Sequence, residues 1–107
     1  MKYTQGWTEF EIQSLAFSLM RKHLYPAFLI RGDYQLEGCR APIAVFKANK
    51  GQGPTLKLIV EVKQPDDAVP SGNLKSYAET LGVQYVLIAG LKEAYKAVEK
   101  VQEHLFK

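Results

Sequence analysis

The segment Leu58–Lys63 places two opposite charges, Glu61 and Lys63, in an otherwise apolar stretch of β-branched and aliphatic residues. Side chains of a strand alternate between its two faces, so the two charged residues share one face while Val60 and Val62 occupy the other. Burying these charges costs folding free energy unless each is paired or binds a metal. The pattern therefore predicts either a metal site or a structural ion pair whose lysine reaches solvent.

A second carboxylate, Asp33, lies in the apolar segment Leu29–Tyr34, where Gly32 permits close approach of backbone or ligand. If the strands form a meander, Asp33 can reach Glu61. Two carboxylates that meet suit Mg²⁺, which binds one or two protein carboxylates and completes its shell with water and phosphate. The sequence therefore predicts a magnesium site between these strands.

Glu9 is a third candidate acid, in an expected first helix. At roughly 100° per residue it lies near the middle of the apolar stripe that begins at Ile12, whereas Glu11 lies outside that stripe. Glu11 instead completes a capping box with Thr8. We assign Glu9 to the inner face, with one alternative left open: an exposed first-turn acid favoured by the helix dipole.

The elements that must position these residues follow in the order αβββαβα. We expect a helix from the Thr8 cap to Leu24, strands over 27–36, 41–48 and 55–64, a helix over 73–82 capped by Asn73 and stopped by Gly82, a strand over 83–89, and a helix over 91–106. The apolarity of the third strand predicts burial on both faces. A helix before the fourth strand predicts a parallel crossover, and the first three strands an antiparallel meander.

Composition limits the classes of protein. The 107 residues fit one domain (1–107), and the net charge of +3 is too weak to indicate a nucleic-acid partner by itself. A single cysteine, Cys39, excludes an internal disulfide, suits the cytoplasm and is expected to be a half-buried small hydrophobe. His23 and His104 are too isolated to predict zinc. The sequence has no apolar run long enough to predict a membrane span, and its first seven residues have no apolar segment that would predict secretion.

The acid of the first helix, Asp33 and the Glu61-x-Lys63 pair together resemble the PD-(D/E)xK nuclease superfamily. The sequence is most similar to the N-terminal nuclease domain of type I restriction subunits and to their small stand-alone relatives. Arg31–Tyr34 resembles their Arg-Pro-Asp-Tyr with Gly for Pro, and Asn73–Tyr77 resembles their Gln-x-x-x-Tyr with Asn for Gln. The resemblance covers nearly the whole chain. It implies a restriction-endonuclease-like α/β fold: an αβββαβ core with a mixed four-stranded sheet flanked by helices, and a C-terminal helix.

The resemblance also implies an activity, the Mg²⁺-dependent hydrolysis of DNA phosphodiester bonds, with Mn²⁺ as a substitute ion. Asp33 and Glu61 would bind the ion together with the backbone carbonyl of Val62. The ion would lower the pKa of a bound water and hold the scissile phosphate oxygen. Lys63 would orient that water or stabilise negative charge developing on phosphorus.

Further residues would support this site. Glu9 would steady a water or a second ion, and Gln64, Asn73 and Tyr77 would support Lys63 or contact the substrate backbone. Because the core uses nearly all of the chain, specificity would come from DNA shape, a homodimer or a separate targeting subunit. The departures at Asn73 and Gly32 also favour an alternative: a nucleic-acid-binding or interaction module that keeps the fold without cleavage.

Overall fold

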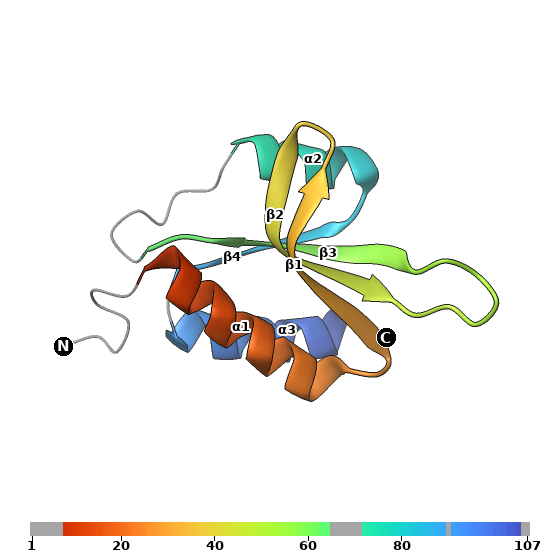
Figure 1. Ribbon diagram of the computed structural model, residues 1–107, viewed down its shortest axis with the longest axis horizontal. Helices are drawn as coiled ribbons and strands as arrows, with labels where there is room; N and C mark the ends of the chain where they lie inside the picture. The colour runs from red at the N-terminus through yellow and green to blue at the C-terminus, as the bar shows by residue number, and fades with distance from the viewer. Residues whose placement is uncertain (1–7, 65–71, 90, 106–107) are drawn as a thin grey trace.

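The computed structural model describes residues 8–64, 72–89 and 91–105 and has the expected order of elements (Figure 1). These are α1 (Glu9–Leu24), β1 (Phe28–Leu36), β2 (Cys39–Lys47), β3 (Thr55–Val62), α2 (Gly72–Leu81), β4 (Gln84–Ile88) and α3 (Leu91–Leu105). The chain is thus an α/β protein with one mixed four-stranded sheet and three helices. None of the helices in the described part of the chain is long and apolar enough to cross a bilayer.

The strands lie in the order β1-β2-β3-β4. β1 pairs antiparallel with β2, β2 pairs antiparallel with β3, and β3 pairs parallel with β4. The predicted meander and the predicted parallel crossover through α2 are therefore confirmed. β3 lies between β2 and β4, and its residues Ile59 and Val60 are fully buried, which confirms the prediction of a central strand covered on both faces.

Helices cover both faces of the sheet. α1 and α3 lie side by side against one face, here the α1 face, and α2 covers part of the other, the α2 face (Figure 1). The α1 face and its helices bury one large cluster: Ile12, Ala16, Met20, Leu24, Phe28, Ile30, Ile43, Val45, Leu58, Val60, Val62, Ile88, Ala94 and Val98. The α2 face buries a smaller one: Leu36, Ala41, Ile59, Leu74 and Ala78, with Cys39, Leu56, Tyr77, Val83 and Tyr85 packed against it.

Local signals in the sequence explain where the helices begin and end. The Thr8 hydroxyl accepts a hydrogen bond from the Glu11 backbone N–H at 3.2 Å, and the Glu11 carboxylate accepts one from the Thr8 N–H at 2.9 Å, so the capping box is confirmed. Gly82, with a φ of +70°, ends α2 as predicted. The capping role predicted for Asn73 is wrong, because α2 begins at Gly72.

One backbone feature of β1 changes the direction of its side chains. Gly32 lies on the α1 face, since a Cβ added there would be 3.7 Å from the ring of Phe17. Strict alternation would put Tyr34 on that face too, yet its ring packs against Phe46 with Leu29 nearby, on the α2 face. Between them Asp33 has a φ of +49°, a left-handed conformation that aspartate adopts more readily than most residues. The conformation of Asp33 therefore reverses the alternation of side chains in β1, so that Tyr34 points to the α2 face.

Candidate functional site

The Glu61 carboxylate is buried at the carboxyl end of the central strand. Its side chain is only 4% exposed, and it lies on the α2 face, as its strand neighbour Ile59 does. The hydroxyl of Tyr85, from the parallel neighbour β4, donates a hydrogen bond to Glu61 Oε1. A carboxylate removed from water in this way needs such donors, because its desolvation costs more than that of a neutral group.

Lys63 lies on the same side of β3 as Glu61, as the alternation predicts. Its Nζ is 4.0 Å from Glu61 Oε2, and the lysine side chain remains 26% exposed. That separation is too long for a hydrogen bond but gives a direct electrostatic attraction. The expected pairing of Glu61 with Lys63 is therefore confirmed, and both interpretations of the pair, metal site and structural ion pair, include it.

The backbone carbonyl of Val62 points away from β4. The Lys63 N–H donates to the Ile88 carbonyl of β4 at 2.9 Å, and in a trans peptide the preceding carbonyl points the opposite way. The Val62 oxygen is therefore directed toward the β2 side, past Ile43–Val60, the last pair in the ladder between β2 and β3. The Glu61 carboxylate and this carbonyl supply two hard oxygen atoms of the kind that Mg²⁺ prefers.

Tyr85 is a site residue that the sequence analysis missed. Burial, together with the hydrogen bond to Glu61 and the charge of that carboxylate, raises the pKa of the Tyr85 phenol well above its usual value of 10.0. Tyr85 is therefore a neutral hydrogen-bond donor at any physiological pH. Alternation within 83–89 could have placed it on one face, but only the parallel register, which pairs Tyr85 with Ile59, brings it to Glu61.

This raised pKa predicts a loss of stability at alkaline pH. Folded Tyr85 keeps its proton at a pH at which the unfolded chain has released it, so its contribution is complete below about pH 10 and declines as the pH rises above that. We expect urea titrations at roughly pH 9.5 to 11.5 to show that the free energy of unfolding falls less steeply with pH in Tyr85→Phe than in the unchanged chain. Equal slopes in the two proteins would contradict the shifted pKa.

Asp33 has partners of its own. Its carboxylate forms an ion pair with Arg40 of β2 and accepts a hydrogen bond from the Gln13 side-chain amide of α1 at 3.0 Å. The same amide nitrogen also donates to the Pro42 carbonyl at 2.9 Å, which ties α1 to β2. Asp33 and Arg40 are both about half exposed, so this pair contributes little to stability by itself.

The structure does not bring Asp33 to Glu61. In the register of β1 and β2 Asp33 falls opposite Pro42, so the whole of β2 lies between the two acids. Asp33 is turned toward Gln13 on the α1 side, whereas Glu61 contacts Tyr85 on the α2 side. The meander is as expected, but the left-handed conformation at Asp33 turns its carboxylate away from the face on which alternation would have put it.

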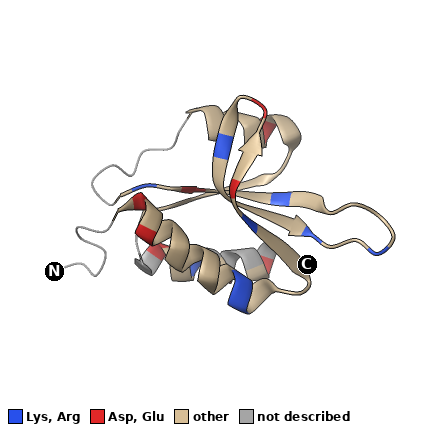
Figure 2. Cartoon of the chain, in the orientation of Figure 1, with Lys and Arg blue, Asp and Glu red and all other residues tan. Residues whose placement is uncertain are grey.

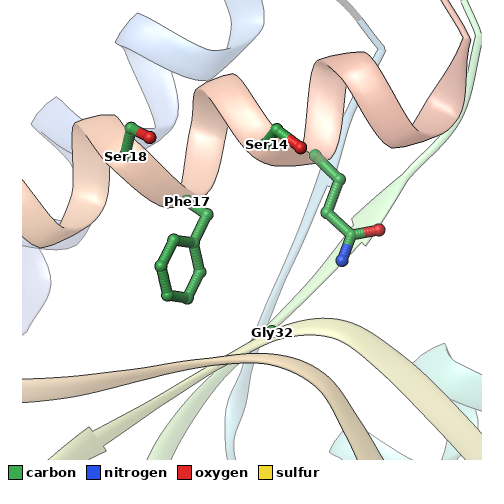
Figure 3. Close-up of a pocket in the computed structure, with 5 residues that line it drawn as sticks. Ser14, Phe17, Ser18 and Gly32 are labelled. Atoms are coloured by element: carbon green, nitrogen blue, oxygen red, sulfur yellow. The ribbon is translucent and has the colours of Figure 1, made fainter.

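A hollow of about 270 Å³ adjoins Asp33 on the α1 side and is lined by Gln13, Ser14, Phe17, Ser18 and Gly32. Figure 3 shows the Phe17 ring pointing from α1 toward the backbone of Gly32, with Ser14 and Ser18 along the same helix. Among the residues that the structure describes, no charged side chain lines this hollow. It lies on the opposite side of the sheet from Glu61, so the two do not form one site.

The remaining candidates add less to the geometry around the Glu61–Lys63 pair. The assignment of Glu9 to the inner face is wrong: the first turn of α1, Glu9–Glu11, is exposed, and burial begins at Ile12. Asn73 and Gln64 are exposed, and Tyr77 is half-buried against the α2-face cluster. Their proposed support of Lys63 stays a prediction.

The oxygen atoms of Glu61 and the Val62 carbonyl are of the type that Mg²⁺ binds, and a single carboxylate is the smallest number with which protein Mg²⁺ sites are usually built. Mg²⁺ commonly binds through one or two carboxylates and keeps several waters. Within residues 8–64, 72–89 and 91–105, no three His, Cys, Asp or Glu side chains gather closely enough to hold a metal by themselves. An ion held by Glu61 and the Val62 carbonyl would therefore need water or a substrate to supply the rest of its ligands.

Comparison with known proteins adds no relative: no protein-family model, no curated protein and no solved structure matches this chain. A function for this chain therefore has to be inferred from its sequence motifs and from the geometry around Glu61.

Proposed function

We propose that this chain is a restriction-endonuclease-like nuclease domain that hydrolyses DNA phosphodiester bonds with the help of Mg²⁺. The observation that carries the proposal is the buried Glu61 carboxylate facing Lys63 at the end of the central strand. The αβββαβα order and the mixed sheet, with helices on both faces, support it. A buried carboxylate in a central strand costs stability, and a catalytic use would account for its presence.

Each residue has a distinct part in the proposed reaction. Glu61 and the Val62 carbonyl would hold the ion, and bound Mg²⁺ supplies positive charge that polarises a phosphate oxygen and acidifies water. Tyr85 fixes the carboxylate by donating to Oε1, which leaves Oε2 on the side of Lys63. The Lys63 ammonium, still partly in solvent, would donate to the phosphate oxygens as negative charge develops on them.

The second candidate function is a nucleic-acid-binding module of the same fold without cleavage. The position of Asp33 favours it, because Arg40 and Gln13 hold this carboxylate away from Glu61. In that case Glu61 and Lys63 form a structural pair. Asp33 could become a second ligand only by releasing both partners.

A nicking assay separates the two candidates. Supercoiled plasmid is incubated with the protein over a titration of Mg²⁺ and, separately, of Mn²⁺, and the nicked and linear forms are quantified on a gel. The nuclease proposal expects metal-dependent nicking that excess EDTA abolishes. Salt-sensitive DNA binding with no nicking at any concentration of either ion would favour the binding module, and nicking unaffected by EDTA would contradict the metal site.

The role of Asp33 is tested by Asp33→Asn. Asparagine also adopts the left-handed conformation that position 33 requires, whereas alanine would add strain there. Since Asp33 lies across β2 from Glu61, we expect nicking to fall less than about tenfold, well below the effect of removing a residue that contacts the ion. Arg40→Gln serves as the matched control, because it removes the other half of the ion pair. A much larger loss for Asp33→Asn than for Arg40→Gln would show that Asp33 binds the ion after all.

A further inference from the structure

A second hollow lies on the α2 face, on the part of the sheet that α2 leaves open. It has a volume of about 240 Å³ and is lined by Leu29, Arg31, Tyr34, Phe46 and Pro54, which we call the aromatic groove. Tyr34 and Phe46 pack edge to face, with ring centroids 5.0 Å apart. Tyr34 is 37% exposed, so its ring is accessible to a ligand.

Two backbone irregularities build this groove. The left-handed conformation at Asp33 brings Tyr34 to the face of Leu29 and Phe46. The register of β2 and β3 shifts between Val45 and Phe46, so that Phe46 pairs with Leu56 and Lys57 becomes an extra residue of the ladder. Bulges of this kind redirect side chains and are frequent near functional sites.

The surroundings of the groove are positively charged. Residues 41–60 contain Lys47, Lys50 and Lys57 and no acidic residue, whereas the charge of Arg40 is already balanced by its ion pair with Asp33. Figure 2 shows that the part of the β2–β3 hairpin that projects beyond the helices carries blue segments and no red ones. Arg31, itself exposed, adds a guanidinium to the groove lining. An anionic ligand with an apolar, planar part complements these groups.

We propose that the aromatic groove binds unpaired bases of single-stranded nucleic acid, with Tyr34 stacking on a base and the hairpin lysines contacting phosphates. Proteins that bind single strands combine aromatic rings with a basic surface along the backbone. Bases within a duplex are stacked on one another, so an accessible ring favours a single strand. The inference needs no cleavage: it depends on the groove alone and goes beyond the proposed nuclease site by naming a separate contact with nucleic acid.

The test measures fluorescence anisotropy of a labelled single-stranded oligothymidylate in EDTA, so that no metal-dependent reaction occurs. Tyr34→Leu keeps the apolar bulk and removes the ring, and we expect binding roughly tenfold weaker. Tyr34→Phe should restore most of the affinity. Tyr95→Leu, which changes a still more exposed tyrosine of α3, is the matched control and should leave binding unchanged.

Two further variants, both of lysines, test whether the hairpin charge contacts phosphates. Lys50→Gln should lower the slope of log affinity against log salt by about 0.7, the value for one phosphate contact on a single strand, whereas Lys22→Gln in α1 should not. Because EDTA removes any ion from Glu61, binding measured in this way does not depend on the nuclease site, and failure of the nuclease proposal would leave this result untouched. Absence of oligonucleotide binding, equal affinity of Tyr34→Leu, or selective binding of an uncharged proline-rich peptide in the groove would overturn the inference.

Discussion

Replacing Glu61 with Gln, or Lys63 with Met, is expected to lower Mg²⁺-dependent DNA nicking by about 100-fold or more while the protein stays folded. Removing a single group that stabilises charge in a transition state typically costs that much. Glu61→Gln keeps an oxygen that can accept the Tyr85 hydrogen bond but removes the charge that would hold the ion. Lys63→Met keeps the apolar stem and removes only the ammonium. Nicking rates at saturating Mg²⁺ measure the effect, and circular dichroism checks the fold.

The same chemical changes on α2 are the controls. Glu79→Gln and Lys75→Met make the same chemical changes at exposed residues of that helix and should leave nicking within about twofold of the unchanged chain, as changes of exposed side chains generally do. If all four variants cut DNA alike, the activity comes from elsewhere or from a contaminant, and the site proposal fails.

The strands and helices of this chain are readable from its sequence because their signals are local. A cap, a Gly stop and runs of apolar residues give each element to within two residues of its ends, and the meander and crossover follow from the order of elements. The neighbourhood of Glu61 and Lys63 is also local, since both belong to one strand and alternation alone puts them on one face.

Contacts between strands were predicted less well, for two physical reasons. The position of Asp33 depends on a single left-handed residue, and alternation cannot reveal where a strand exchanges its faces. The contact of Tyr85 with Glu61 depends on the register of parallel strands joined through a helix, which no pattern within either strand encodes. Glu9 shows a third limit, since periodicity gives the angle of a residue around a helix but not whether the first turn is buried.

The second large effect is expected in the free energy of unfolding, when the hydrogen bond between Glu61 and Tyr85 is removed. Tyr85→Phe alone should lower the free energy of unfolding by about 1–2 kcal/mol, because a buried carboxylate loses a hydrogen-bond donor. In a Glu61→Leu background the same change should cost less than about 0.5 kcal/mol, because an apolar side chain needs no donor. Urea titrations at pH 7 of the four proteins of this cycle give the coupling energy. The same cost for Tyr85→Phe in both backgrounds would mean that the hydrogen bond contributes nothing.

The double variant Glu61→Leu/Tyr85→Phe also tests whether the buried Glu61 carboxylate serves catalysis or the stability of the fold. Apolar replacements for a buried ionic group are often neutral or stabilising, so we expect the double variant to be at least as stable as the unchanged chain. Nicking, by contrast, should be lost. A chain that gains stability while losing activity has kept its carboxylate at the end of β3 for binding an ion and not for holding the sheet together. If the double variant instead unfolds, while Glu61→Gln stays folded and cuts DNA normally, Glu61 is a structural residue and the candidate site must be sought elsewhere on the sheet.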